Sequence, residues 1–447
     1  MMSPGDHREE QDLSNGGTSG LARLLQRAAK VEPGETSAVV TAFLLYFCVM
    51  SGYFAVRPVR ETVGTILGPE RTADLFVGTW IASLAIVPIY GWLCARFKRS
   101  VFLPWIYGFV AASLVLVGLV LGASESVFAA QFFYVFISVL NLFVISVLWS
   151  FLLELFDSGQ VKRLFGIIAA GGTAGALAGP MLTDLTVRFI GNDGVLFMGA
   201  GLFVGAIVCQ RVLLVIWKRT GWSAAAAAAG DRPMGGNPFA GFTLILKSPY
   251  LIGIATFVVL AASANTFLYF AQLRVVTDTF ADEEVRTQVF SRIDYTVQTL
   301  TIIAQLLFTG RIASRWGVGS LLMFVPMLMV GGFLLLASLY TFPVLVAVMI
   351  TRRVGEYSFI RPGREMLFSR FDTETKYKAK NAIDVPVYRG GDALIAQVDS
   401  RLDGAGMSPA NIALIGAGAA VLWAINGVLL GRSKRGGTGS SAPRPTA

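Results

Sequence analysis

The chain has 447 residues, of which 54% are hydrophobic and 15% are charged, and its mean hydropathy is +0.64. Soluble domains carry about 25% charged residues, so this composition excludes an ordinary water-soluble protein. The net charge is +9, but the basic residues gather between apolar runs, as orientation signals of membrane proteins do. No nucleic-acid partner is therefore expected.

The residue types needed for most enzyme and metal chemistry are scarce. The single histidine, His7, lies in a polar N-terminal tail. The cysteines Cys48, Cys94 and Cys209 lie in or beside apolar runs without a CxxC pair, which is typical of small buried hydrophobic residues. No nucleophile with a base is recognisable. We expect no enzyme activity, no catalytic residue, no metal site and no cofactor.

The predicted elements are apolar helices, because about 20 residues of helix cross ~30 Å of hydrocarbon. Six spans are predicted at 38–56, 73–94, 101–122, 128–153, 164–190 and 195–217. Six more follow at 249–273, 289–310, 318–339, 341–360, 383–398 and 410–430. The predicted fold class is all-α, a polytopic membrane protein with twelve transmembrane helices in two six-helix halves.

The breaks between the runs divide the chain into five parts. These are a cytoplasmic tail at 1–37, an N-terminal six-helix bundle at 38–217, a cytoplasmic linker at 218–248, a C-terminal six-helix bundle at 249–430 and a cytoplasmic tail at 431–447. Most Lys and Arg residues outside the spans fall on the side of the N-terminus, which is the cytoplasmic side by the positive-inside rule. We expect a multi-pass protein of the cell inner membrane with both termini cytoplasmic.

A short pattern recurs in both halves. The loop from Gly91 to Arg96 follows the second span as G-x-x-x-x-R, and the loop from Gly310 to Arg315 follows the eighth span in the same form. This repeat resembles the parallel half repeats of the major facilitator superfamily, whose halves rock about a site at the membrane midplane. The resemblance implies that the first, fourth, seventh and tenth spans line a central cavity.

Charged residues inside these four spans or just beyond their ends are candidate site residues, because a charge in hydrocarbon is costly unless it faces water or a partner. They are Arg57, Arg60, Glu61, Glu154, Arg274, Arg352, Arg353 and Glu356. In the tenth span Glu356 lies four residues after Arg352 and three after Arg353, so we expect one of the two arginines to pair with it on one helix face. The other arginine is left over.

Two further spans carry polar residues, on one face of a helix in the eighth span and around a helix break in the eleventh. In the eighth, Asp294 and Gln298 begin a stripe on one helical face. In the eleventh, polar residues interrupt a helix that Pro386 already disturbs, and broken helices in a membrane usually border a cavity or a moving joint. The candidates there are Asp384, Tyr388, Arg389 and Asp392.

Two interpretations of the buried arginines stay open. In the first they form a cationic path for an anion, since guanidinium binds phosphate and carboxylate in a bidentate way. In the second they form gating salt bridges, or extend from helix ends to the membrane surface.

The fifth span carries glycines at every fourth position, Gly171, Gly175 and Gly179. No strand precedes them, so a phosphate-cradling loop is not favoured. Small residues at this spacing let two membrane helices approach closely. We expect this face to pack against a neighbouring helix.

Two stretches, Tyr53 to Thr62 and Lys376 to Ala393, resemble bacterial relatives of the ATP/ADP carrier family, a branch of the facilitator superfamily. The resemblance implies exchange of a nucleotide or related phosphorylated solute by alternating access. It also implies that the polar residues inside the two stretches are functionally important. These are Arg57, Arg60, Glu61, Lys378, Lys380, Asn381, Asp384, Arg389 and Asp392.

The function expected from the sequence is secondary active transport of an organic or phosphorylated anion, such as a nucleotide, by alternating access. The alternative is a proton-coupled facilitator-type symporter or efflux protein for a small solute that is not a nucleotide. The expected partners are the lipid bilayer and a small anionic solute. The oligomeric state is left open, and a monomer satisfies the pattern.

Overall fold

The computed structural model describes residues 31–432 apart from 33, 98, 221–239 and 372. The predicted tails therefore fall almost wholly outside the described residues, and so does most of the predicted linker. Throughout the described part the secondary structure is helical. Seven of the described helices are long and apolar enough to cross a membrane. The all-α membrane fold class is confirmed.

The N-terminal half consists of four helical elements, two of which are bent. They are α3 (Thr36–Arg96), α4 (Arg99–Ala123), α5 (Val127–Leu155) and α6 (Ser158–Thr220). Both α3 and α6 are too long for one crossing and contain a glycine in the left-handed region, Gly68 with φ 80° and Gly191 with φ 71°. Glycine adopts such φ values without a steric penalty, so each element turns there and supplies two crossings.

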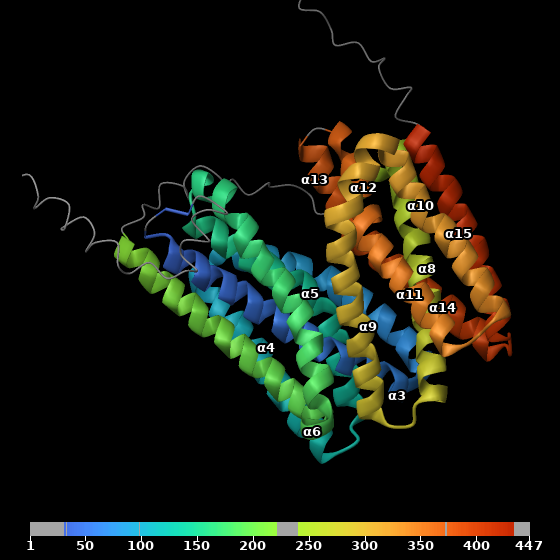
Figure 1. Cartoon of the computed structure of the whole chain (residues 1–447), viewed down its shortest axis with the longest axis horizontal. Helices are drawn as coiled ribbons and strands as arrows, with labels where there is room; N and C mark the ends of the chain where they lie inside the picture. Colours follow the sequence, from blue (N-terminus) through green and yellow to red (C-terminus); the bar gives the residue numbers. More distant parts are fainter. Residues whose placement is uncertain (1–30, 33, 98, 221–239, 372, 433–447) are drawn as a thin grey trace, which may run out of the picture.

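The C-terminal half contains more and shorter elements. They are α7 (Ala240–Lys247), α8 (Pro249–Thr279), α9 (Glu283–Ala304), η2 (Gln305–Thr309), α10 (Gly310–Ser338), α11 (Phe342–Gly355), η3 (Glu356–Ile360), α12 (Arg361–Leu367), η4 (Phe368–Arg370), α13 (Thr373–Ala382), η5 (Ile383–Val387), α14 (Tyr388–Gly404) and α15 (Pro409–Arg432). Figure 1 shows α9 and α10 as two separate rods. With η2, η3 and η5 joined to their neighbours, these elements supply the other six predicted crossings.

Two wide π-helical turns replace regular helix where the sequence predicted the tenth and eleventh spans. The turn η3 begins at Glu356, and η5 contains Pro386. Proline has no N–H to donate to the preceding turn. Trp80 of α3 donates its indole N–H to the Pro386 carbonyl oxygen over 3.1 Å. Such turns occur mostly at functional sites. The predicted disturbance near Pro386 is therefore present as a π-helical turn.

The two halves lean against each other at one end and separate at the other (Figure 1). At the joined end the Thr62 and Thr287 hydroxyls meet at 2.6 Å, and Thr287 also donates to Asn192, the residue after the turn at Gly191. Arg286 donates to the Thr65 hydroxyl there over 3.2 Å. At the open end lie the start of α3, the end of α6, α13 and the end of α15. Each half has its own large cluster of buried apolar residues.

Many large apolar side chains face outward, as bilayer contact requires. Trp105 of α4 is 76% exposed and Phe128 of α5 is 79% exposed. In water such a surface would aggregate. Against lipid tails it is the stable arrangement, because hydrocarbon solvates these side chains as a protein core does.

The predicted glycine face of α6 packs directly on α3. A Cβ atom placed at Gly179 would lie 2.6 Å from the Ser51 carbonyl oxygen and 2.8 Å from the Ala55 nitrogen. Gly175 faces the backbone of Phe47 in the same way. Backbone atoms cannot move aside as a flexible side chain can, so only glycine permits this approach.

We expect Gly179→Ala to destabilise the N-terminal half by about 1–3 kcal/mol, as overpacking of a filled contact does. Thermal unfolding of the detergent-purified protein measures the change. Gly201→Ala is the matched control on the same helix, because no atom lies within 4 Å of its added Cβ. Equal unfolding midpoints for the two variants would show that the α3–α6 contact tolerates a side chain.

Candidate functional site

A cavity of about 260 Å³ lies between the two halves. Its walls come from α3 and α5 of the first half and from α8, α9, α11, η3, α12, η5 and α14 of the second. Eleven of the predicted site residues line it. They are Arg57, Arg60, Glu61, Asp294, Arg352, Arg353, Glu356, Asp384, Tyr388, Arg389 and Asp392.

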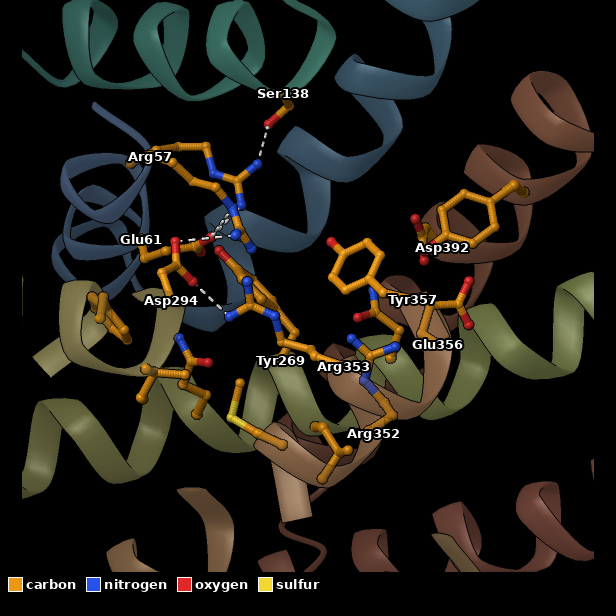
Figure 2. A pocket seen from close by; sticks show the side chains of 18 of the residues that line it. Arg57, Glu61, Ser138, Tyr269, Asp294, Arg352, Arg353, Glu356, Tyr357 and Asp392 are labelled. Atoms are coloured by element: carbon orange, nitrogen blue, oxygen red, sulfur yellow. Dashed lines mark hydrogen bonds and ion pairs between the residues drawn. The ribbon is translucent and has the colours of Figure 1, made fainter. Parts of the chain in front are cut away.

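The centre of the cavity is an ion-pair bridge between the halves, shown in Figure 2. Asp294 of α9 accepts from Arg57 of α3 over 3.0 Å and from Arg353 of α11 over 2.6 Å. Asp294 is 3% exposed. One carboxylate therefore holds two arginines from opposite halves, and the bridge carries an excess positive charge.

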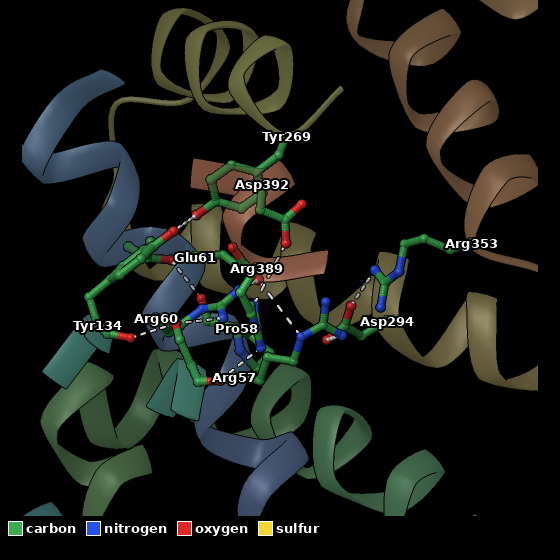
Figure 3. Close-up of polar contacts among 12 residues, drawn as sticks. Arg57, Pro58, Arg60, Glu61, Tyr134, Tyr269, Asp294, Arg353, Arg389 and Asp392 are labelled. Atoms are coloured by element: carbon green, nitrogen blue, oxygen red, sulfur yellow. Dashed lines mark hydrogen bonds and ion pairs between the residues drawn. The ribbon is translucent and has the colours of Figure 1, made fainter. Parts of the chain in front are cut away.

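A second carboxylate lies one helical turn along α3 from Arg57. Glu61 receives a hydrogen bond from Arg60, and Arg57 also approaches it at 3.7 Å (Figure 3). Arg60 further donates to the Ser138 hydroxyl over 3.0 Å and lies over the Tyr134 ring at 5.2 Å. Three arginines thus share Glu61 and Asp294.

The eleventh crossing adds a polar cluster that also reaches across the cavity. Arg389 of α14 donates to the Ser138 carbonyl oxygen of α5 over 3.1 Å. Its ion pair with Asp392 is long, 3.9 Å, and Asp392 also accepts from Thr266 over 2.9 Å. Ser138 of the first half is therefore contacted by arginines from both halves.

The predicted pairing of Glu356 with a neighbouring arginine is not found. Arg353 pairs with Asp294 instead, and Glu356 lies 3.6 Å from Arg361. The backbone there is still regular helix, since the Glu356 N–H bonds to the Arg352 carbonyl oxygen. The pairing differs because Asp294 of α9 and Arg361 of α12 lie within ion-pair distance of Arg353 and Glu356. Arg352 is buried and has no ion pair in the described part of the chain. One arginine is indeed left over, and it is Arg352.

The cavity lining includes two arginines that lie beyond the predicted tenth span, which was expected to end at residue 360. Arg361 and Arg364 belong to α12, which continues the tenth crossing, and Arg364 pairs with Asp384 over 2.9 Å. Arg361 also lies over the Tyr357 ring at 4.7 Å. In total seven arginines and five carboxylates line the cavity, a net charge of +2.

Six predicted residues lie outside the cavity lining: Glu154, Arg274, Gln298, Lys378, Lys380 and Asn381. Arg274 pairs with Asp399 and Asp403 near the joined end of α14. Lys380 of α13 pairs with Glu365 over 2.6 Å. These contacts are ion pairs between helices of the C-terminal half.

Most of the aromatic residues that line the cavity are not among the predicted site residues. Tyr134 and Tyr269, from opposite halves, share a hydrogen bond of 2.7 Å between their hydroxyls, and Phe76 packs on both rings. Tyr357 lines the same space. Aromatic residues are common in every span, so only their position on the cavity-facing side could have distinguished them.

The described residues contain no group of three His, Cys, Asp or Glu side chains that could hold a metal ion. The cavity acids each lie against an arginine. The chemistry available is therefore electrostatic binding by guanidinium and packing on aromatic rings.

Residues 42–363 match the model of the Major Facilitator Superfamily. The chain is 21% identical over 438 residues to "ADP,ATP carrier protein 1" of Chlamydia muridarum (strain MoPn / Nigg), which covers 81% of this chain and 82% of that protein. This likeness in sequence therefore extends over most of both chains.

Two solved structures have the same fold. One is the nucleoside transporter NupG, with a TM-score of 0.61, 16% identity and coverage of 89% of this chain and 99% of that one. The other is a bacterial homologue of the iron transporter ferroportin in the inward-facing state, with a TM-score of 0.62, 14% identity and coverage of 89% and 98%. At these identities the likeness is one of fold alone.

We expect Asp294→Asn to lower the free energy of unfolding by about 3 kcal/mol, because removing one member of a buried ion-pair group leaves its partners uncompensated. Thermal unfolding in detergent tests this. The control is Asp278→Asn, at the exposed end of α8 and outside the cavity. If both variants unfold at the same temperature as the parent, the Asp294 bridge does not hold the halves together.

Proposed function

The chain belongs to the Major Facilitator Superfamily and is a transporter rather than an enzyme, and from this premise we propose that it carries a phosphorylated organic anion by alternating access. Exchange of nucleotides is the form of this transport that we propose in particular. The membrane that we propose is the cell inner membrane, with both termini cytoplasmic.

The observation that carries the proposal is the unbalanced positive charge of the cavity. Seven arginines face five carboxylates there, and Arg352 has no ion pair with any described residue. One terminal nitrogen of Arg353 is buried without a hydrogen-bond partner. Uncompensated charge in a low-dielectric site costs several kcal/mol per ion. A ligand with two or more negative charges would remove that cost.

Arg60 and Arg364 also have a buried nitrogen without a hydrogen-bond partner, but each is in an ion pair. Arg352 and Arg353 are consecutive on α11 and line the same cavity (Figure 2). The guanidinium group presents a planar fork of N–H donors that matches the oxygen geometry of phosphate. We place the phosphate groups of the substrate at Arg352 and Arg353, where donors are free. Arg57 lies across Asp294 from Arg353 and completes this anion site.

The aromatic side of the cavity supports a substrate with a flat organic part. Tyr53, Phe76, Tyr134, Tyr269 and Tyr357 line it together. Bases stack on such rings with about 1–3 kcal/mol per base. A nucleotide has both a flat base and a phosphate chain, and the relative from Chlamydia muridarum is named an ADP,ATP carrier.

The way in which the halves meet supports alternating access. The joined end is held by short polar contacts between halves, such as Thr62 with Thr287. With cytoplasmic termini, the open end faces the cytoplasm, and this is the inward-facing conformation. Rocking the halves about the cavity would exchange which end is open.

One observation favours the alternative of proton-coupled transport. Asp392 is 3% exposed, and its arginine partner is 3.9 Å away. Buried carboxylates in transport proteins often carry protons. A pH gradient in the transport experiment therefore distinguishes this second function from exchange.

We expect proteoliposomes that contain the purified protein to take up labelled ADP or ATP only when they are preloaded with unlabelled nucleotide. Inorganic phosphate, nucleosides without phosphate and neutral sugars are the comparison solutes. Uptake of a neutral or cationic solute in preference to every phosphorylated one would refute an anion carrier. Uptake that follows an imposed pH gradient without internal nucleotide would favour the proton-coupled alternative.

We expect Arg352→Gln to raise the apparent KM for the anionic substrate about tenfold or more, because a charge-assisted hydrogen bond is worth about 1.5–3 kcal/mol. Arg352→Lys keeps the charge without the fork, so its KM should lie between those of the parent and the glutamine variant. The unfolding temperature of Arg352→Gln should rise above that of the parent, since the variant removes an uncompensated buried charge and breaks no ion pair.

Arg211→Gln is the matched control, at an exposed position of α6 outside the cavity. An unchanged KM in Arg352→Gln, alongside an unchanged KM in this control, would exclude Arg352 from the substrate site.

A further inference from the structure

A second hollow lies on the flank of the C-terminal half, outside the central cavity. It has a volume of about 500 Å³ and runs between α9 and α11. Its apolar wall includes Val289, Ile293, Phe342, Val346 and Ile350. All but Ile293 are partly exposed. In a membrane protein this flank faces hydrocarbon tails, so the groove opens toward lipid.

Two arginines form a cationic rim at the end of this groove near the joined end. Arg188 of α6 donates to Gln288 over 2.8 Å and has no ion pair with a described carboxylate. Arg292 of α9 pairs with Asp184 over 3.0 Å, and its side chain is 59% exposed. Both contacts join the two halves. The rim therefore retains free N–H donors beside an apolar channel.

An apolar groove with a cationic rim at its polar end matches one class of ligand. A phospholipid has a phosphate that guanidinium binds in a bidentate way and an acyl chain that the apolar wall solvates. A water-soluble anion would leave the wall uncovered, and an uncharged hydrocarbon would leave the arginine donors unused. The position on the bilayer flank places phospholipid next to the groove at the highest concentration of any solute.

The groove and the central cavity share a wall. The side chain of Ile293 lines both of them. The next residue, Asp294, holds Arg57 and Arg353 in the central bridge. A molecule in the groove thus contacts the helix that carries the bridge, one residue away from it.

We propose that a phospholipid binds in this groove, with its phosphate between Arg188 and Arg292 and one acyl chain along Ile293, Val346 and Ile350. Because the rim residues come from both halves, the bound phosphate adds a contact across the joined end. Occupancy of the groove therefore stabilises the conformation in which this end is closed. This site lies outside the transport cavity and does not depend on the identity of the transported solute.

Native mass spectrometry of the detergent-purified protein, titrated with phosphatidylglycerol, measures the binding. The double variant Arg188→Ala/Arg292→Ala should bind the lipid about tenfold more weakly, as expected from the loss of charge-assisted hydrogen bonds. Val346→Trp should do the same by filling the acyl channel. The controls are Arg401→Ala, an exposed arginine near the joined end, and Leu422→Trp, an exposed residue of α15; neither lines the groove.

Equal lipid binding by the parent, both groove variants and both controls would mean non-specific surface lipid and would overturn the proposal. Phosphatidylglycerol should also raise the unfolding temperature of the parent and of the controls, but not that of the arginine variant. A rise of the same size in the arginine variant would refute the stabilising role. Since no transported solute is present in either measurement, a failure of nucleotide transport leaves this test unaffected.

Discussion

The arrangement of the cavity follows from the cost of leaving a charge without a partner in a low-dielectric interior. Asp294 lowers that cost in the centre of the cavity, because its single carboxylate pairs with Arg57 of one half and with Arg353 of the other. A buried ion pair of this kind contributes little net stability compared with an apolar contact, but breaking it is expensive. It therefore specifies how the two halves meet more than it stabilises either half.

The same cost explains why some helices are polar and line the cavity while others are apolar and face lipid. The polar elements α9, α11 and α14 do not meet the criteria of an apolar span, whereas α4, α10 and α15 do. The apolar helices expose side chains such as Trp105 to lipid and thereby shield the polar ones. In the second half, η3 and η5 add wide turns at the points where carboxylates enter the cavity. The irregular backbone is tolerated because it lines a polar space rather than facing lipid.

The sequence predicted the fold and most of the cavity because both follow from local rules. Runs of apolar residues predict crossings, and a charge inside a crossing predicts a polar cavity. Which residue a charged side chain pairs with does not follow from such rules. The spacing of Arg353 and Glu356 predicted a pair within one helix, but the partner of Arg353 is Asp294 on another helix. The predicted tenth span ended too early, at residue 360. From the sequence alone Arg361 looks like a charged residue of a loop, and only the structure shows that it lies over the Tyr357 ring.

The two kinds of contact between the halves differ in how easily water replaces them, and this difference supports exchange as the mode of the proposed transport. Hydrogen bonds such as Thr62 with Thr287 contribute about 0.5–1.5 kcal/mol each, because water offers the same bonds when the joined end opens. The central bridge is different, since its arginines lose Asp294 only at the cost of an uncompensated buried charge. A phosphorylated ligand could replace the carboxylate at Arg57 and Arg353 during the change of conformation. In an empty cavity, which has a net charge of +2, no anion is present to replace the Asp294 carboxylate at these arginines. If the substrate is a phosphorylated anion, as proposed, the loaded carrier would have the lower barrier, which is the energetic condition for exchange instead of one-way release.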